Sequence, residues 1–450
     1  MSVWSNLVKR FRAPALPKPG PTYTQTYMDN LLNVLRLYFN QLDELLANIL
    51  AAQPVNVRFF GTALDAFGRT RISQPYTLFD SQNRYEKNDL FDETTATGGT
   101  VTYTANESTV NLNVTTSSGS SVTRQSYRSF AYQPGKGLMV MNTFVMGPPQ
   151  TNMRMRVGYF NAENGVFLER DGATVYIVRR TFVSGAAVDT RVAQTDWNGD
   201  RLNGTGASTL TLDLTKAQIL WMDFEWLGVG SVRVGFVIDG QPVICHTFNN
   251  ANNLTTVYMT TAILPVRYEV TNTGAVAAAA TLKQICSTVI SEGGYEKKVA
   301  TFVARMTAAN ASISTTFVPL VSIRLASGRT GAVVVPDSYA VLPTAGAATT
   351  FEIVLVKNPT LTGAAWGATD SNNVQRDISA TSFTGGTIIE SQYVLSSFLS
   401  QGMSSGGGDY NWDLQLGATI VGTSDIYTVA ARTLSGTQTA IASMSFWDLT

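Results

Sequence analysis

Apolar residues between positions 28 and 52 recur at alternating steps of three and four, which is the spacing of a helix that assembles through one face. The seam consists of Met28, Leu31, Leu35, Tyr38, Leu42, Leu45 and Ile49. A second apolar row lies beside it at Leu32, Phe39 and Leu46. So wide a stripe must be buried, and it predicts a homotrimer. The alternative is a helix packed against its own domain.

The expected helix occupies residues 23–53. Thr26 followed by Asp29 resembles a capping box at its start, and Pro54 ends it.

Residues 1–22 form a separate short segment in which an apolar face precedes a proline-rich spacer. The apolar side chains at helical spacing are Trp4, Leu7, Val8 and Phe11. Four prolines between positions 14 and 21 favour an extended tether. The pattern predicts an anchor that docks into a larger body, and a disordered tail is the alternative.

Residues 54–93 are broken by turn signals into pieces too short for a helix. We expect an extended arm or neck that lies on neighbouring subunits. Alternatively, these pieces are the first strands of the next domain.

From residue 94 to 296 the hydrophobic period becomes two, which is typical of strands with one buried face. The clearest part is residues 221–248, where three apolar strands alternate with turns and Asp239-Gly240 gives a tight hairpin signal. Other expected strands are residues 100–103, 110–114, 137–145, 153–159, 165–170 and 173–179. This meander predicts an antiparallel β-sandwich.

Residues 297–450 repeat the same period after an alanine-rich loop at 275–280. The expected strands are residues 315–326, 331–335, 349–356, 387–398, 413–421, 425–431 and 437–447. They predict a second, smaller sandwich. The fold class is therefore mainly β, with two antiparallel sandwiches preceded by one long helix.

Composition excludes several classes of function. The 450 residues carry 32 basic and 32 acidic side chains, so no electrostatic footprint for nucleic acid exists. Only 14% of residues are charged, which indicates a surface that is polar without being charged. The apolar runs are too short to predict membrane insertion.

Few residues offer catalytic or metal chemistry. Cys245 and Cys286 are expected to be buried thiols, with one disulfide as the alternative. His246 is the only histidine, and neither a nucleophile motif nor a set of metal ligands accompanies it. Nucleotide-binding glycine motifs are absent. We therefore expect no metal, no cofactor and no enzyme.

Two weaker site hypotheses remain. Asp223 and Glu225 share one face of a strand at a spacing compatible with acid–base catalysis, although any polar outer face gives the same spacing. Asp196, Trp197 and Asp200 lie in one loop that could hold Ca²⁺ or stack a sugar on the indole, and a plain turn is the alternative.

Several segments resemble virion structural proteins of tailed, marine-type bacteriophages. The first is FGTALDAFGRTRIS at residues 60–73, followed by TLFD at 77–80. The segment EWLGVGSVRVGFVIDG at residues 225–240 is similar to a lectin-like sandwich module of those proteins, and LPVRYE at 264–269 and SEGGY at 291–295 continue the similarity. LRLYFNQLD at residues 35–43 resembles their N-terminal helix. The resemblance spans roughly residues 25–300 and implies jelly-roll or lectin-like sandwiches, without assigning site residues.

The expected function is that of a non-enzymatic structural protein on the exterior of a phage virion, as a fibre, spike or head decoration. Residues 1–22 would bind other virion proteins, and the helix would join identical chains. A receptor-binding protein that recognises host surface glycans is the alternative, and a glycan depolymerase is a third, weaker hypothesis.

Overall fold

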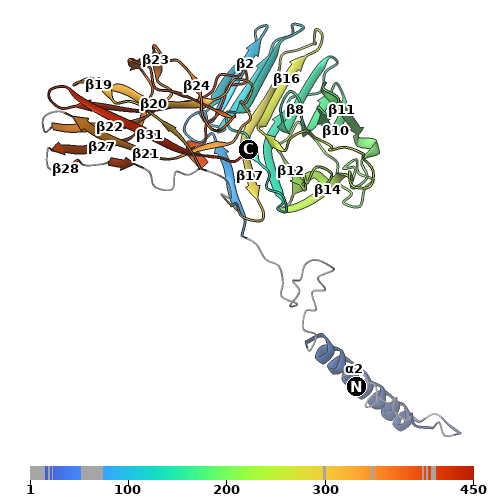
Figure 1. Cartoon of the computed structure of the whole chain (residues 1–450). Coiled ribbons are helices and arrows are strands. Elements are labelled where there is room, and N and C mark those ends of the chain that lie inside the picture. Colours follow the sequence, from blue (N-terminus) through green and yellow to red (C-terminus); the bar gives the residue numbers. More distant parts are fainter. Residues whose placement is uncertain are drawn as a thin grey trace. The chain divides into compact units, whose positions relative to one another are not determined.

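The computed structural model describes residues 16–18, 21–22, 24–51, 74–296, 301–345, 349–397, 400–401, 404–406 and 412–450 (Figure 1). The chain divides into two units, residues 1–72 and 73–450. The expected anchor residues Trp4, Leu7, Val8 and Phe11 lie outside the described residues.

The first unit contains the helix α2 (Gln25–Ala51), which confirms the element expected from the heptad pattern. Its N-cap is Thr24 instead of Thr26, because the Thr24 hydroxyl accepts a hydrogen bond from the backbone N–H of Tyr27 at 3.2 Å. Leu32 and Phe39 are 58% and 57% exposed. The side chains of Leu45 and Ile49 lie outside the described residues. No helix of the described chain is long and apolar enough to cross a membrane.

The second unit begins with a sandwich of two antiparallel sheets. Sheet I has the order β14-β13-β12-β7-β17-β4-β3, and β1 also pairs with β17. Its strands are β1 (Tyr76–Gln82), β3 (Thr100–Thr104), β4 (Thr109–Val114), β7 (Leu138–Met146), β12 (Gln218–Phe224), β13 (Val232–Ile238), β14 (Gln241–Phe248) and β17 (Ala280–Ser291).

Sheet II has the order β11-β10-β9-β8-β16-β5-β2. Its strands are β2 (Phe91–Ala96), β5 (Ser121–Ser126), β8 (Met153–Phe160), β9 (Gly165–Asp171), β10 (Thr174–Thr181), β11 (Val188–Ala193) and β16 (Val266–Asn272). A short ladder joins β6 (Phe130–Ala131) to β15 (Ile263–Leu264), and the 3₁₀ turn η2 (Gln194–Asp196) follows β11.

Period-two alternation builds the core between these sheets. Along β7 every second residue is buried, and Val140 and Phe144 have no exposed surface. The hairpin between β13 and β14 turns at Asp239 and Gly240, whose φ angles of 52° and 75° are those of a primed turn. The expected meander is therefore confirmed.

The second sandwich has a sheet of β18, β31, β21 and β29, with β19 also paired to β31. These strands are β18 (Thr301–Arg305), β19 (Asn310–Ile313), β21 (Val334–Ala345), β29 (Ser404–Gly406) and β31 (Gln438–Asp448). The opposing sheet has the order β24-β25-β20-β30-β22-β27-β28. Its strands are β20 (Val318–Leu325), β22 (Thr349–Lys357), β24 (Gly367–Ala368), β25 (Val374–Asp377), β27 (Thr387–Ser397), β28 (Ser400–Gln401) and β30 (Ile426–Thr433). A hairpin of β23 (Thr360–Thr362) and β26 (Ser382–Thr384) and the 3₁₀ turn η3 (Trp412–Leu414) complete it. The predicted fold class is confirmed.

Two expectations need correction. Residues 76–82 were expected in an extended arm, with the first strands of the next domain as the alternative. They form β1, whose Tyr76 lies opposite Ser291 of β17, so the alternative holds for these residues. The sandwich unit therefore starts at Ser73 and not at residue 94. Residues 413–421 were expected to form a strand, but apart from the turn η3 and one isolated bridge at Ala418 they are irregular. Leu416 and Ala418 pack into the core of the second sandwich, whereas the Gln415 side chain and the N–H of Ala418 bond to the first.

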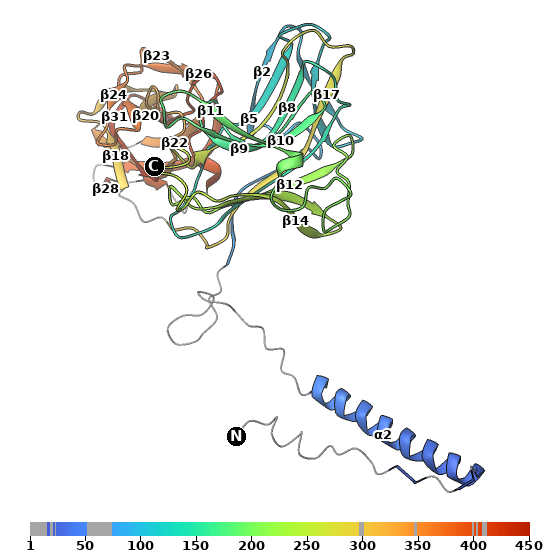
Figure 2. The same ribbon diagram turned by 90° about the vertical axis from the view of Figure 1, so that its right-hand side faces the viewer.

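The two sandwiches lie side by side and share a close junction (Figure 2). Val333 and Val335 of the second sandwich belong to the hydrophobic core of the first. The buried Gln415 donates from Nε2 to the carbonyl of Ser129 at 2.8 Å, and the N–H of Ala418 donates to the carbonyl of Tyr127 at 2.8 Å. These hydrogen bonds between the two sandwiches fix their relative position.

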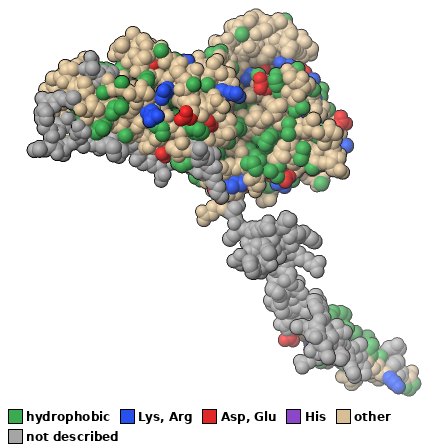
Figure 3. All heavy atoms as spheres, viewed as in Figure 1, with side chains coloured by type: hydrophobic (Ala, Val, Ile, Leu, Met, Phe, Trp, Pro, Cys, Tyr) green, Lys and Arg blue, Asp and Glu red, His purple; other side chains and the backbone are tan. Residues whose placement is uncertain are grey.

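Figure 3 shows that uncharged polar side chains and backbone cover most of the viewed face, with only scattered charges. This surface agrees with a chain in which 14% of residues are charged.

Candidate functional site

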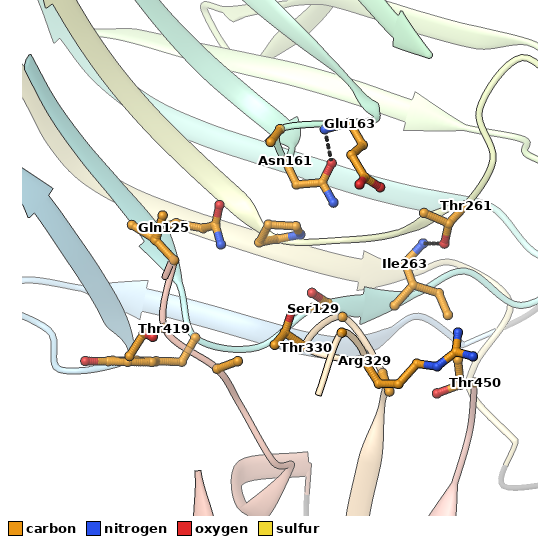
Figure 4. Close-up of a pocket in the computed structure, with 18 of the residues that line it drawn as sticks. Gln125, Ser129, Asn161, Glu163, Thr261, Ile263, Arg329, Thr330, Thr419 and Thr450 are labelled. Carbon is orange, nitrogen blue, oxygen red and sulfur yellow. Dashed lines mark hydrogen bonds between the residues drawn. The ribbon is translucent and has the colours of Figure 1, made fainter. Parts of the chain in front are cut away.

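A polar pocket with a volume of about 580 Å³ lies at the junction of the two sandwiches (Figure 4). One wall comes from β5, the turn between β8 and β9, and the segment from β15 to β16. The other comes from the loop between β20 and β21, residues 418–420 and Thr450. The sequence separation of these segments explains why no local motif marks the site.

The turn after β8 presents Asn161 to the pocket. Its Oδ1 accepts hydrogen bonds from the backbone N–H groups of Glu163 and Asn164, both at 2.8 Å. Asn164 is itself buried and donates to the Thr260 hydroxyl at 2.7 Å. The amide nitrogen of Asn161 consequently points into the cavity (Figure 4). The turn is rigid before any ligand arrives.

Gln125 on β5 is oriented in a similar way. Its Oε1 accepts a hydrogen bond from Nη1 of Arg267 on the neighbouring strand β16 at 3.2 Å, so its amide nitrogen is left to face the cavity (Figure 4). Arg267 also pairs with Glu269 at 2.9 Å, and its guanidinium lies 5.5 Å from the centre of the Phe160 ring.

The charge of Arg267 is therefore compensated. Burial alone would raise the pKa of Glu269, but the positive charges of Arg267 and Arg156 outweigh it and hold that pKa below the ordinary value. Glu269 remains an anion at neutral pH, and its negative charge offsets the positive charge that Arg267 presents to the pocket.

The opposite wall contributes a cation of a different kind. Arg329 lies in a turn that is closed by a hydrogen bond of 2.9 Å from the N–H of Ala332 to the carbonyl of Arg329. The preceding Gly328 has a φ of 74°, which glycine adopts without strain. Within the part of the chain that the structure describes, the Arg329 guanidinium forms no hydrogen bond or ion pair. Glu163 is likewise exposed and unpaired among the described residues.

The chemistry of the pocket is that of polar recognition. It offers amide, hydroxyl and guanidinium groups, but only one side-chain carboxylate, Glu163. Retaining and inverting glycoside hydrolases use two carboxyl groups that flank the scissile bond. The lining does not contain that arrangement. Among the described residues, no group of three His, Cys, Asp or Glu side chains could hold a metal ion.

Asp223 and Glu225 do not form the acid–base arrangement that their spacing allowed. Asp223 is bonded to Arg233, and Glu225 accepts a hydrogen bond from the Ser231 hydroxyl at 3.2 Å. The structure instead brings Asp223 near Glu292, since a Cβ added at Gly137 would lie 2.7 Å from Glu292 Oε2 and 3.7 Å from Asp223 Oδ1. Burial and the charge of Asp223 raise the pKa of Glu292.

The loop of Asp196, Trp197 and Asp200 matches the plain-turn alternative. Trp197 is 1% exposed and donates from Nε1 to the carbonyl of Val192, so its indole has no free face for a sugar. The Asp200 carboxylate accepts backbone hydrogen bonds from Leu202 and Ser208. This corrects the expectation of sugar stacking on the indole.

The remaining reactive side chains are structural. Cys245 and Cys286 are free thiols, and burial raises the pKa of Cys245 to about 12. The Nδ1 atom of His246 accepts a hydrogen bond from the N–H of Asn198 at 3.3 Å, and burial lowers the pKa of His246. The sequence singled out none of the residues that line the pocket. Gln125, Asn161 and Arg329 are common polar residues whose only local signals are the neighbouring turns.

Comparison with known proteins gives fold similarities only. No protein family model and no curated protein sequence matches the chain. Solved structures of similar fold include the β-glucanase of Bacillus licheniformis (11% identity, TM-score 0.32), which covers 49% of this chain and 99% of its own. The carbohydrate recognition domain of Emp47p (10% identity, TM-score 0.31) covers 49% of this chain and 98% of its own. Peanut lectin (10% identity, TM-score 0.29) covers the same shares. These similarities assign no role to any residue.

Proposed function

We propose that this chain is a non-catalytic receptor-binding protein on the exterior of a phage virion, and that the pocket between its sandwiches binds a saccharide of the host surface. The observation that carries the proposal is the pre-formed polar pocket with inward-facing amide nitrogens and a single carboxylate. Saccharides present rings of hydroxyl groups, which amide and hydroxyl side chains match as both donors and acceptors.

Rigidity of the pocket supports binding. Hydrogen bonds from buried Gln415 and from the N–H of Ala418 hold one wall against the other, and buried Asn164 holds the turn that carries Asn161. A site ordered in advance loses little conformational entropy when a ligand binds.

Assembly through α2 supports attachment to a surface. Leu32 and Phe39 remain more than half exposed in a single chain, and a second copy of the same stripe would cover them. Three linked pockets bind a repetitive glycan far more tightly than one, because later contacts form at high effective concentration. The homotrimer is part of this proposal.

The virion location rests on the sequence resemblance at residues 60–73 and 225–240. In this proposal residues 1–22 attach the chain to other virion proteins, and the sandwiches face outward.

A glycan array with the full-length protein tests the binding function, followed by calorimetric titration of the strongest ligand. Gln125→Met removes an inward-facing donor while keeping the size and neutrality of the side chain, and we expect about three- to tenfold weaker binding. Gln241→Met is the matched control, because Gln241 is exposed at the start of β14. Failure to bind any saccharide, or equal affinity of Gln125→Met and wild type, would refute the proposal.

A further inference from the structure

We infer that the saccharide bound in this pocket carries a carboxylate and that Arg329 binds this group. The inference rests on the proposed function, because it names the class of ligand for the same pocket. It starts from the distribution of charge around the cavity.

Three charged side chains line the pocket, namely Arg267, Arg329 and Glu163. Arg267 is already engaged by Glu269 at 2.9 Å and by Gln125 at 3.2 Å. Arg329 has no such partner among the described residues. An anion that enters the pocket therefore meets one uncompensated guanidinium.

The position of Arg329 suits recognition of a ligand group. It projects from the second sandwich, whereas Asn161 and Gln125 project from the first (Figure 4). A ligand held by those amides would thus present its far side to Arg329. The planar guanidinium can donate two parallel hydrogen bonds to a carboxylate, which adds directional selectivity to the charge attraction.

Glu163 limits the charge that the pocket accepts. Its carboxylate reaches toward the same cavity from the turn after β8 and is unpaired among the described residues (Figure 4). A phosphate with nearly two negative charges is repelled more strongly by Glu163 than a carboxylate with one. The side-chain charges of Arg329, Glu163 and the pair of Arg267 and Glu269 sum to zero. A monoanion bound at Arg329 therefore leaves one net negative charge in the pocket, whereas a dianion leaves two, which favours the monoanion. An acidic sugar of the uronic acid type meets these conditions.

Calorimetric titration of full-length protein with two matched ligands tests the inference. One is an oligogalacturonate, and the other is the same oligosaccharide after its carboxyl groups are reduced to alcohols. We expect the acidic ligand to bind at least about tenfold tighter at low salt, with a difference that shrinks as salt is added. Arg329→Gln should abolish that difference and leave the affinity for the reduced ligand unchanged.

Two further variants sharpen the result. Glu163→Gln should tighten binding of the acidic ligand, because it removes a repulsive charge. Arg201→Gln is the matched control, since Arg201 is an exposed arginine outside the pocket lining and should leave both affinities unchanged. The melting temperature of each variant shows whether the fold is retained.

The outcomes separate the two proposals. Saccharide binding that Gln125→Met weakens, without preference for the acidic ligand, overturns the inference and leaves the proposed function standing. A preference that survives Arg329→Gln also overturns the inference. Tighter binding of a sulfated oligosaccharide of equal length that depends on Arg329 overturns the carboxylate as the recognised group. Failure of every saccharide to bind overturns both.

Discussion

Replacement of Glu269 by Gln should destabilise the first sandwich, because this carboxylate joins a network of arginines on the outer face of sheet II. Glu269 is 8% exposed and bonds to Arg267 at 2.9 Å and Arg156 at 3.3 Å. Arg156 also pairs with Glu169 at 2.6 Å. Glu269→Gln keeps the size of the side chain but leaves two partly buried guanidinium groups without one of their anions.

The expected loss follows from the burial of the network. Removal of one partner of a buried ion pair costs about 3–5 kcal/mol, because the remaining charge is uncompensated. A glutamine can still accept one hydrogen bond, so the lower end of about 3 kcal/mol applies. For a sandwich of this size, about 3 kcal/mol lowers the melting temperature by about 6–12 °C.

Differential scanning calorimetry across pH measures this effect and tests its electrostatic origin. The pKa of Glu269 lies below its ordinary value of 4.5 in the folded chain. Glu269 is protonated near pH 4.5 in the unfolded chain but only at a lower pH in the folded chain. The stabilisation from its charge is therefore complete above about pH 5.5, and it is lost as the pH falls toward the folded pKa. The gap between wild type and variant should therefore be widest at neutral pH and shrink in acid.

Glu107→Gln is the control, because Glu107 is a glutamate on the surface that pairs with Lys283. It should melt close to wild type at every pH. The reasoning is refuted if Glu269→Gln also melts like wild type at pH 7, or if its deficit stays constant down to pH 3.

Three further predictions concern assembly, the junction and attachment. Light scattering should show a trimer for the wild type and monomers for the double variant Leu35→Asp and Leu42→Asp, and a monomeric wild type would contradict the proposed assembly through α2. Gly417→Ala places a Cβ 2.9 Å from Tyr127 Cβ, so calorimetry should show a loss of stability of about 1–3 kcal/mol at the junction, and saccharide binding should weaken. An unchanged stability and affinity would contradict a close fit between the two sandwiches. A chain that begins at Tyr23 should melt like the full-length protein yet be missing from purified particles, and its normal incorporation would argue against the anchor.

The sequence predicts those parts of the fold in which a local period determines burial. The heptad stripe marks α2 to within a few residues, and the alternation in residues 221–248 gives β12, β13 and β14 with their turn. In each case a residue's neighbours three, four or two positions away are also its neighbours in space. Only the N-cap shifted, from Thr26 to Thr24.

The errors occur where burial depends on distant segments. Residues 413–421 alternate like a strand, but they form an irregular segment between the two sandwiches. Leu416 packs into the core of the second sandwich, and Gln415 and the N–H of Ala418 bond to the first near Ser129. Residues 76–82 form a strand by pairing with β17, and the sequence around residues 76–82 gives no sign of that distant partner. Contacts between segments that are far apart in the sequence leave no periodic pattern in it. The pocket is lined by such segments, so the sequence does not predict it.

Composition conceals the feature on which the proposed specificity depends. A net charge of zero and 14% charged residues indicate a bland surface. The fold nevertheless gathers Arg156, Glu169, Glu269 and Arg267 on one face of sheet II, where they form ion pairs with one another. Charges that are mutually paired respond weakly to a ligand, because each already has its counterion. Arg329 lies outside that network, in a loop of the other sandwich, and has no counterion among the described residues, which is the condition that the proposed recognition of an anionic sugar requires.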